Sequence, residues 1–210
     1  MSQSYLYLPA ICLASYLYGS IPFSLVLGKA RGIDVRQYGS GRTGAANTLR
    51  TLGPAASAMV FAGDLSKGIL AVVLARMLMG TPLAEVAAGL FAVAGHNWSA
   101  YIGFRGGRGV AASVGAIALM APPVVLVGAV VFGAVAALTR YVSLASMVAS
   151  AAVPIALAPL VFAGLFPPEY LAFGVAAAIL IALQHKDNLE RLRAGKERRI
   201  GEKAEGVAEP

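Results

Sequence analysis

The run VVLVGAVVFGAVAALT occupies residues 124–139 and holds sixteen residues without one charged side chain. An α-helix rises 1.5 Å per residue, so a hydrocarbon core of about 30 Å needs about 20 apolar residues. Comparable runs recur along the chain. The apolar helices that we expect cover Tyr5–Lys29, Pro54–Met79, Leu83–Asn97, Val124–Thr139, Leu144–Phe166 and Tyr170–Gln184. This pattern predicts an all-α integral membrane protein.

The composition favours the same class. Of 210 residues, 58% are hydrophobic and only 13% are charged, whereas soluble domains carry about a quarter charged residues. The formal net charge is +7, but most cations lie in loops beside apolar runs. There, membrane orientation and anionic headgroups or substrates explain the charge better than nucleic acid does. Cys12 is the single cysteine, which excludes an internal disulfide. No cleavable signal peptide is expected, because the N-terminus lacks a basic region.

A seventh apolar run, Val110–Met120, is too short for a straight crossing. Either it is a partial or tilted helix, or it forms a re-entrant hairpin with its neighbours. If it crosses, the basic loops and the basic tail share one side, and loops 80–82, 122–123 and 164–169 on the other side hold no Lys or Arg. The positive-inside rule then predicts about seven transmembrane helices, the N-terminus outside, the C-terminus cytoplasmic and partly re-entrant cytoplasmic loops. We expect one transmembrane domain over residues 1–200 and a charged, disordered tail over 201–210.

The first polar segment, Ser40–Arg50, places Gly41 and Gly44 close together. Glycine permits positive φ and close backbone approach, which an amide cradle around phosphate requires. Ser40 offers a hydroxyl donor, and Arg50 offers a planar fork for phosphate or carboxylate. The alternative interpretation is a flexible loop whose arginines only set the orientation.

The second polar segment is FRGGRG, residues 104–109. If Val110 opens a helix, the preceding amides and the positive helix end point at an anion. No Lys-Ser/Thr follows a GxxxxG spacing, so the segment is not a Walker A loop. The alternative is a re-entrant turn anchored at the interface by Trp98 and Tyr101.

Two histidines remain. His96 follows an apolar run and could cap a helix end rather than act in catalysis. His185 and Asn188 share a face if the helix continues, so the pair could jointly hydrogen-bond a substrate, although such a pair at a helix end is more often structural. Two distant histidines and one apolar cysteine make no recognisable metal-ligand set, so no metal or other cofactor is expected.

Charged residues also lie within or beside the apolar runs. Asp64 and Lys67 stand at i and i+3, which allows them to pair, either as a neutral structural pair or as a pair facing a cavity. Arg140 precedes Ser143 at the start of an apolar run. It could anchor the helix at the interface or reach the same anion.

Three ordered motifs resemble those of the bacterial acyl-phosphate:glycerol-3-phosphate acyltransferases, and the resemblance covers nearly the whole chain. The family's SGNxGAxNxxR corresponds to Ser40–Arg50, its GHxxPxxxxFxGGKGVA to Gly95–Ala111, and its HxxNxxRLxxGxE to His185–Glu197. The departures from these patterns are Arg42 for asparagine, Ser99 for proline and Arg108 for lysine. Arginine keeps the charge of lysine but replaces a compact ammonium with a planar fork.

The resemblance implies transfer of a fatty acyl group from acyl phosphate to the 1-hydroxyl of sn-glycerol 3-phosphate, the first acylation step of phospholipid synthesis. The residues expected to act in catalysis are Ser40, Arg50, His185 and Asn188. Those expected to bind substrate or phosphate are Gly41, Gly44, Asn47, His96, Gly106, Gly107, Arg108, Gly109, Arg140 and Ser143. Those expected to support the structure are Glu197, Asp64 and Lys67. Either a His185 of near-neutral pKa or the phosphate of the acceptor could take the hydroxyl proton.

The implied setting is the bacterial cytoplasmic (inner) membrane, with the active site facing the cytoplasm. The expected partners are the two substrates and membrane lipids, and a monomer is compatible with the sequence. The rival interpretations are a membrane transporter for phosphorylated small anions, a basic scaffold that binds anionic lipid, and an acyltransferase that uses acyl-CoA or acyl carrier protein.

Overall fold

The computed structural model describes residues 4–202 of the chain, with side chains from residue 7 onward. Within this range the secondary structure is helical. The longer α-helices are α1 (Ser4–Gly19), α4 (Pro54–Leu78), α5 (Pro82–Asn97), α6 (Val110–Met120), α7 (Pro122–Thr139), α8 (Val142–Phe162) and α9 (Pro168–Gln184). Shorter helices are α2 (Phe23–Lys29), η1 (Val35–Gln37), α3 (Ala45–Leu52), η2 (Ala100–Ile102) and α10 (Lys186–Arg193). The all-helical expectation is confirmed. Residues 203–210, and with them most of the predicted disordered tail, lie outside the described residues.

The first apolar run is not one continuous helix. The expectation of a single helix over Tyr5–Lys29 is wrong, because α1 ends at Gly19 and α2 begins at Phe23. Pro22 has no N–H for an i→i−4 bond, and its ring disfavours helical geometry in the residue before it. The Ser20 hydroxyl donates to the Tyr16 carbonyl at 2.8 Å and so satisfies one carbonyl at the end of α1.

Four described helical segments are long and apolar enough to cross a membrane: residues 7–29, α4, α7 and α8. Helices α9 and α10 pass the same test as a pair, but their axes are bent by 57°. The 11 residues of α6 rise only about 16 Å, roughly half of the hydrocarbon core. The count of four to five long spans therefore agrees with a membrane protein, while α5 and α6 are shorter than a straight crossing requires.

The helices form a bundle in which α4 is central and contacts α1, α5 and α6. The contact between α4 and α6 is close because glycines face backbone there. A Cβ on Gly68 would collide with the Ala112 carbonyl, and one on Gly115 with the Leu65 carbonyl. Small residues that allow backbones to approach are typical of helix packing in membranes. Helix α7 is the least buried of the four long spans and contacts α8 and α6.

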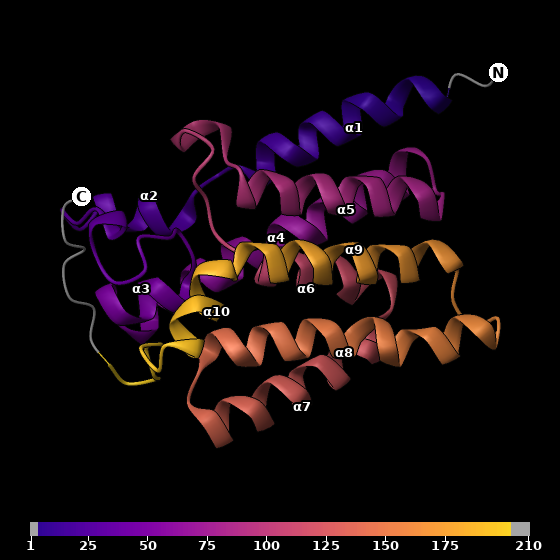
Figure 1. Cartoon of the computed structure of the whole chain (residues 1–210). Helices are drawn as coiled ribbons and strands as arrows, with labels where there is room; N and C mark the ends of the chain where they lie inside the picture. Colours follow the sequence, from indigo (N-terminus) through magenta and orange to yellow (C-terminus); the bar gives the residue numbers. More distant parts are fainter. Residues whose placement is uncertain (1–3, 203–210) are drawn as a thin grey trace.

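The two ends of the bundle differ (Figure 1). The end at the left of the figure gathers α2, α3, α10 and the loop between α5 and α6, and the opposite end carries the short turns that join α4 to α5 and α8 to α9. At that opposite end, Arg76 donates two hydrogen bonds to Glu85, at 2.9 and 2.8 Å. Arg76 also donates to the Leu119 carbonyl at 3.0 Å, and the Tyr170 hydroxyl donates to Glu85 at 2.9 Å. One polar cluster thus joins α4, α5, α6 and α9.

Candidate active site

A cavity of about 420 Å³ lies at the end of the bundle that holds the polar loops. All three polar segments singled out in the sequence line it. The lining residues that the sequence predicted are Ser40, Gly44, Asn47, Arg50, Asp64, His96, Gly107, Arg108, Gly109, Ser143, His185, Asn188 and Glu197. Segments up to 157 positions apart are therefore brought to one site. Their individual roles stay predictions.

The first segment is shaped by Asn47 on α3. Its side-chain NH₂ donates to the Val35 carbonyl at 2.9 Å and to the Tyr38 carbonyl at 3.1 Å. Its Oδ1 accepts from the Ser40 N–H at 3.0 Å. These three bonds fix the turn that enters α3, so Ser40 meets the cavity before the helix and Arg50 meets it near the helix end. The side-chain amide of Asn47 is therefore hydrogen-bonded to backbone groups.

The second segment rests on His96. The Gly107 N–H donates to the His96 carbonyl at 2.9 Å, and a Cβ on Gly107 would collide with the imidazole Nε2. Only glycine therefore lets this backbone lie against the ring. Gly109 follows with φ +80° and forms the N-cap of α6, so the first N–H groups of α6, at Val110 and Ala111, belong to residues that line the cavity.

His96 is in turn held by the charged pair of α4. The Lys67 ammonium donates to Asp64 at 2.7 Å, so the pairing that the i, i+3 spacing allowed does form. His96 Nδ1 lies 3.1 Å from the Lys67 nitrogen and 3.3 Å from the Asp64 carboxylate. All three side chains are buried. The charges of Asp64 and Lys67 compensate each other. Together with His96, which contacts Gly107, the pair supports the glycine loop.

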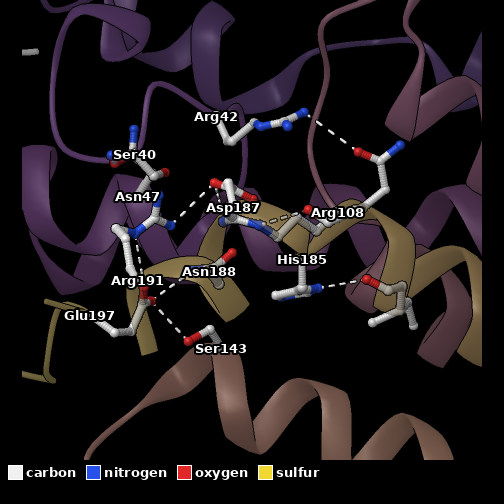
Figure 2. A network of polar contacts seen from close by, with 12 residues as sticks. Ser40, Arg42, Asn47, Arg108, Ser143, His185, Asp187, Asn188, Arg191 and Glu197 are labelled. Carbon is white, nitrogen blue, oxygen red and sulfur yellow. Dashed lines mark hydrogen bonds and ion pairs between the residues drawn. The ribbon is translucent and has the colours of Figure 1, made fainter. Parts of the chain in front are cut away.

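Ion pairs and hydrogen bonds form one network across the third segment, because Arg191 bonds both Asp187 and Glu197 (Figure 2). Arg108 donates to Asp187 at 2.8 Å, and Arg191 reaches the same carboxylate oxygen at 3.1 Å. Glu197 accepts from Ser143 at 2.8 Å, from the Asn188 NH₂ group at 2.7 Å and from Arg191 at 2.9 Å. The network joins α8, α10 and the loop before α6, so the sequence-distant walls of the cavity are fixed relative to one another.

His185 and Asn188 both line the cavity, although the helix does not continue through them: α9 ends at Gln184 and α10 begins at Lys186. His185 Nδ1 lies 2.8 Å from the Ile181 carbonyl. Since a carbonyl only accepts, this contact assigns the proton to Nδ1 and leaves Nε2 as an acceptor. Within residues 4–202, the buried Oδ1 of Asn188 has no hydrogen-bond partner.

A near-neutral pKa, which would let His185 act as the base, disagrees with the surroundings of the ring. Burial, reinforced by the nearby positive charge of Arg108, lowers the pKa of His185 from 6.5 to about 4. Both effects disfavour the imidazolium form. At neutral pH the ring is therefore uncharged, and it is a better hydrogen-bond acceptor than proton carrier.

Four predicted residues lie outside the cavity lining: Gly41, Gly106, Lys67 and Arg140. Arg140, with φ +61°, ends α7, and its guanidinium donates to the Ile200 carbonyl at 2.7 Å. It therefore holds the C-terminal segment against the α7–α8 turn.

Several lining residues were not predicted as site residues: Arg42, Phe61, Phe132, Ser146 and Ile200. Arg42 departs from the motif at a cavity position, which is a usable signal. Single apolar residues in apolar helices carry none. Among the described residues, no group of three or more His, Cys, Asp or Glu side chains could hold a metal ion.

A second cavity, of about 270 Å³, lies between α6, α7, α8 and α9. Its lining is almost entirely apolar, with side chains such as Ile117, Val153 and Phe173. The two cavities share four lining residues: Phe61, Val110, Phe132 and Ser146. A polar, cation-bearing chamber thus adjoins an apolar one at the start of α6. This arrangement suits a ligand with an anionic head and an apolar tail.

Comparison with known proteins agrees with this architecture. The sequence profile of the glycerol-3-phosphate acyltransferase family matches residues 9–195. The chain is 42% identical over 207 residues to glycerol-3-phosphate acyltransferase 3 of Dehalococcoides mccartyi, which covers 92% of this chain and 96% of the relative. It is 45% identical over 198 residues to the glycerol-3-phosphate acyltransferase of Symbiobacterium thermophilum, covering 94% and 96%.

Solved structures give the same answer. The crystal structure of PlsY (YgiH), an integral membrane glycerol 3-phosphate acyltransferase, in its glycerol 3-phosphate form, superposes with a TM-score of 0.86 at 34% identity over 92% of this chain and 96% of that one. The lysophosphatidic acid form gives a TM-score of 0.84 at 33% identity over 92% and 95%. Fold and sequence together define an integral membrane acyltransferase. The chain belongs to the glycerol-3-phosphate acyltransferase family.

Proposed function

We propose that the protein transfers a fatty acyl group from acyl phosphate to the 1-hydroxyl of sn-glycerol 3-phosphate and releases 1-acyl-glycerol 3-phosphate and inorganic phosphate. The observation that carries this proposal is the junction of the two cavities. Residues of all three motifs line a cation-bearing chamber, and an apolar chamber between helices begins beside it. The acyl chain lies in the apolar chamber, and both phosphates lie in the polar one.

The reaction needs no covalent enzyme intermediate. The 1-hydroxyl oxygen of glycerol 3-phosphate forms a bond to the acyl carbonyl carbon, the bond from that carbon to the phosphate oxygen breaks, and the hydroxyl proton ends on a phosphate. Phosphate is a good leaving group, so the protein mainly aligns the reactants and neutralises charge. Alignment of two bound reactants is worth about 7–11 kcal/mol, and donors aimed at the departing phosphate add electrostatic stabilisation.

The site geometry suggests roles for the predicted residues. Arg50 offers donors to the phosphate of glycerol 3-phosphate, while Ser40 and the N–H groups at the start of α6 are available to the second phosphate. The unpartnered Oδ1 of Asn188 accepts a hydrogen bond from a glycerol hydroxyl. Glu197 occupies the Asn188 NH₂ group and so fixes which atom faces the substrate.

The low pKa of His185, about 4, favours a substrate phosphate as the proton acceptor. A phosphate monoester has a second pKa of about 6, closer to neutral pH. His185 then lines the site as an uncharged side chain and does not remove the hydroxyl proton.

The helix order supports a topology of seven crossings, with residues 7–29, α4, α5, α6, α7, α8 and α9 as the spans. The N-terminus is then outside, and the polar loops and α10 lie in the cytoplasm. The arginine-bearing loops all fall at the end of the bundle that holds the large cavity, as the positive-inside rule requires. Residues 1–200 act as one domain in the bacterial inner membrane. The active site faces the cytoplasm, and the protein acts as a monomer.

The direct test is turnover by the purified protein. With palmitoyl phosphate and glycerol 3-phosphate, we expect lysophosphatidate and inorganic phosphate in equal amounts, in the presence of a chelator and without coenzyme A. Palmitoyl-CoA and palmitoyl acyl carrier protein serve as alternative donors in parallel reactions. Faster turnover of either alternative would contradict the proposed donor. Phosphate counterflow in proteoliposomes without any acyl transfer would favour a transporter.

The topology is tested with single cysteines in a Cys12→Ser background. A cysteine at Arg105 should react with an impermeant maleimide only from the cytoplasmic face, and one at Gly164 only from the other face. Reaction of residue 105 in intact cells would overturn the proposed orientation.

A further inference from the structure

Arg42, the departure from the first motif, stands among several charged groups, and its surroundings differ from those of Arg108. The Arg108 guanidinium is bonded to protein groups. It pairs with Asp187 at 2.8 Å, and its Nε donates to the Gln184 carbonyl at 3.3 Å. Among the described residues, Arg42 reaches only the Gln184 side chain, at 3.5 Å, which is the outer limit of a hydrogen bond. Among residues 4–202, no carboxylate forms an ion pair with Arg42.

Arg42 is also close to Arg108. Both guanidinium groups contact Gln184, Arg42 at the side-chain oxygen and Arg108 at the backbone carbonyl. The positive charge of Arg42 adds to burial in lowering the pKa of Arg108. Among the described residues, Asp187 pairs with Arg108 and Arg191 and no carboxylate pairs with Arg42, so positive charge is left uncompensated beside Arg108. An anion between the two arginines relieves their repulsion.

The position of Arg42 indicates which of the two substrates its charge meets. The turn that carries Arg42 packs on the glycine loop, since the Thr43 carbonyl lies 2.7 Å from where a Cβ of Gly107 would stand. That loop opens α6 at Val110, where the polar and apolar cavities meet. Arg50 lies six residues into α3, about 9 Å along the helix from its N-terminal cap. The two arginines therefore meet the cavity at opposite ends of α3.

We infer that Arg42 binds the phosphate of the acyl donor and thereby determines donor affinity in this chain. The inference rests on the proposed function and assigns one of its two phosphates. The acyl tail in the apolar cavity places the donor head beside Val110, within reach of Arg42, while Arg50 is left for the acceptor. Asp187 neutralises Arg108, whereas Arg42 forms no ion pair with a described carboxylate and is available to the donor phosphate.

The first test uses inorganic phosphate as a probe and does not depend on turnover. Phosphate should raise the Tm of the wild-type protein, because a ligand that binds only the folded state stabilises it. For Arg42→Asn, an equal rise should need at least about tenfold more phosphate, the change expected when one charge-assisted hydrogen bond is lost. Arg105→Asn removes the same charge from an exposed residue outside the cavity lining and should behave as wild type.

The second test separates the substrates. Arg42→Asn should raise KM for palmitoyl phosphate at least about tenfold and leave KM for glycerol 3-phosphate within about twofold. Arg42→Lys keeps the charge but loses the fork, so its donor KM should fall between the two. An equal rise of both KM values, a rise for glycerol 3-phosphate alone, or the same effect in Arg105→Asn would overturn the inference.

A double variant tests why Arg42 is needed. Asp187→Asn frees Arg108, so the donor KM of Arg42→Asn/Asp187→Asn should be lower than the product of the two single effects. If the changes in donor KM of the two single variants simply multiply in the double variant, Asp187 does not prevent Arg108 from binding the donor phosphate. If the wild type binds phosphate through Arg42 but does not use palmitoyl phosphate, the proposed function fails and the anion site stands. If the protein uses palmitoyl phosphate but its response to phosphate does not depend on Arg42, the proposed function stands and the inference about Arg42 fails.

Discussion

The two ends of the bundle both contain arginines, but they use them differently. At the end with short turns, Arg76 is matched by Glu85, the Leu119 carbonyl and, through Glu85, Tyr170. At the cavity end, Arg42 and Arg50 form no ion pair with a described carboxylate, and Asn188 keeps a buried oxygen unpartnered. Compensated groups hold helices together. Uncompensated groups in a cavity are available to a charged substrate.

The largest effect should come from breaking the compensated cluster. Glu85→Ala leaves Arg76 and Tyr170 without their shared acceptor, and we expect the free energy of unfolding to fall by about 3 kcal/mol, the lower end for a broken buried pair because the Arg76 side chain is 47% exposed. Thermal unfolding in detergent measures the loss. KM for both substrates should stay unchanged in the folded protein, and a raised KM would contradict the division between the two ends.

The next effect should come from the cavity end. Arg50→Ala should lower kcat/KM about a hundredfold, or about 2.7 kcal/mol, as when one donor to a reacting anion is removed. Its Tm should not fall, because no described ion pair is broken. Arg31→Ala, an exposed arginine of the neighbouring loop, serves as the matched control. Equal turnover of the two variants would remove Arg50 from the site.

The uncharged state of His185 should appear as acid sensitivity. Its pKa is about 4 in the folded protein and about 6.5 in the unfolded chain, so the unfolded state binds more protons between these values. Stability present above pH 6.5 is lost as the pH falls toward 4, with about 2 kcal/mol gone at pH 5. The Tm of His185→Gln should fall less over this range than that of the wild type. Identical pH dependence of the two proteins would contradict the buried neutral imidazole.

The smallest effect should come from trimming the compensated cluster by one hydrogen bond. Tyr170→Phe removes only the bond to Glu85, so we expect a loss of about 1 kcal/mol in the free energy of unfolding. Chemical or thermal unfolding with unchanged turnover would confirm it. A loss as large as that of Glu85→Ala would mean that the hydroxyl, not the ion pair, holds this end.

The sequence predicted the long helices closely, because an apolar run in a membrane protein has few alternatives to a helix. Val110–Met120 has the expected bounds, and α4 ends within one residue of its expected end. The short polar helices α3 and α10 were not predicted. They lie in charged segments without an apolar period, and their positions depend on tertiary contacts such as those of Asn47.

The site was predicted through its motifs, but the state of each charge was not. Nothing in the local sequence indicates that Asp187 neutralises Arg108 and that Arg42 has no partner among the described carboxylates, because the three residues come from separate segments. The pKa of His185 likewise depends on burial and on Arg108. The shared wall of the two cavities also required the structure, since Phe61 and Phe132 lie in uninterrupted apolar runs.

The shortness of α6 matters little to the lipid around the protein. All 11 of its residues are buried or half-buried, and the helix packs against α4, α5, α7 and α9. A lipid-facing span of that length would force the bilayer to thin. Because the neighbouring helices meet the lipid instead, we expect the activity of this enzyme to change little with the thickness of the bilayer.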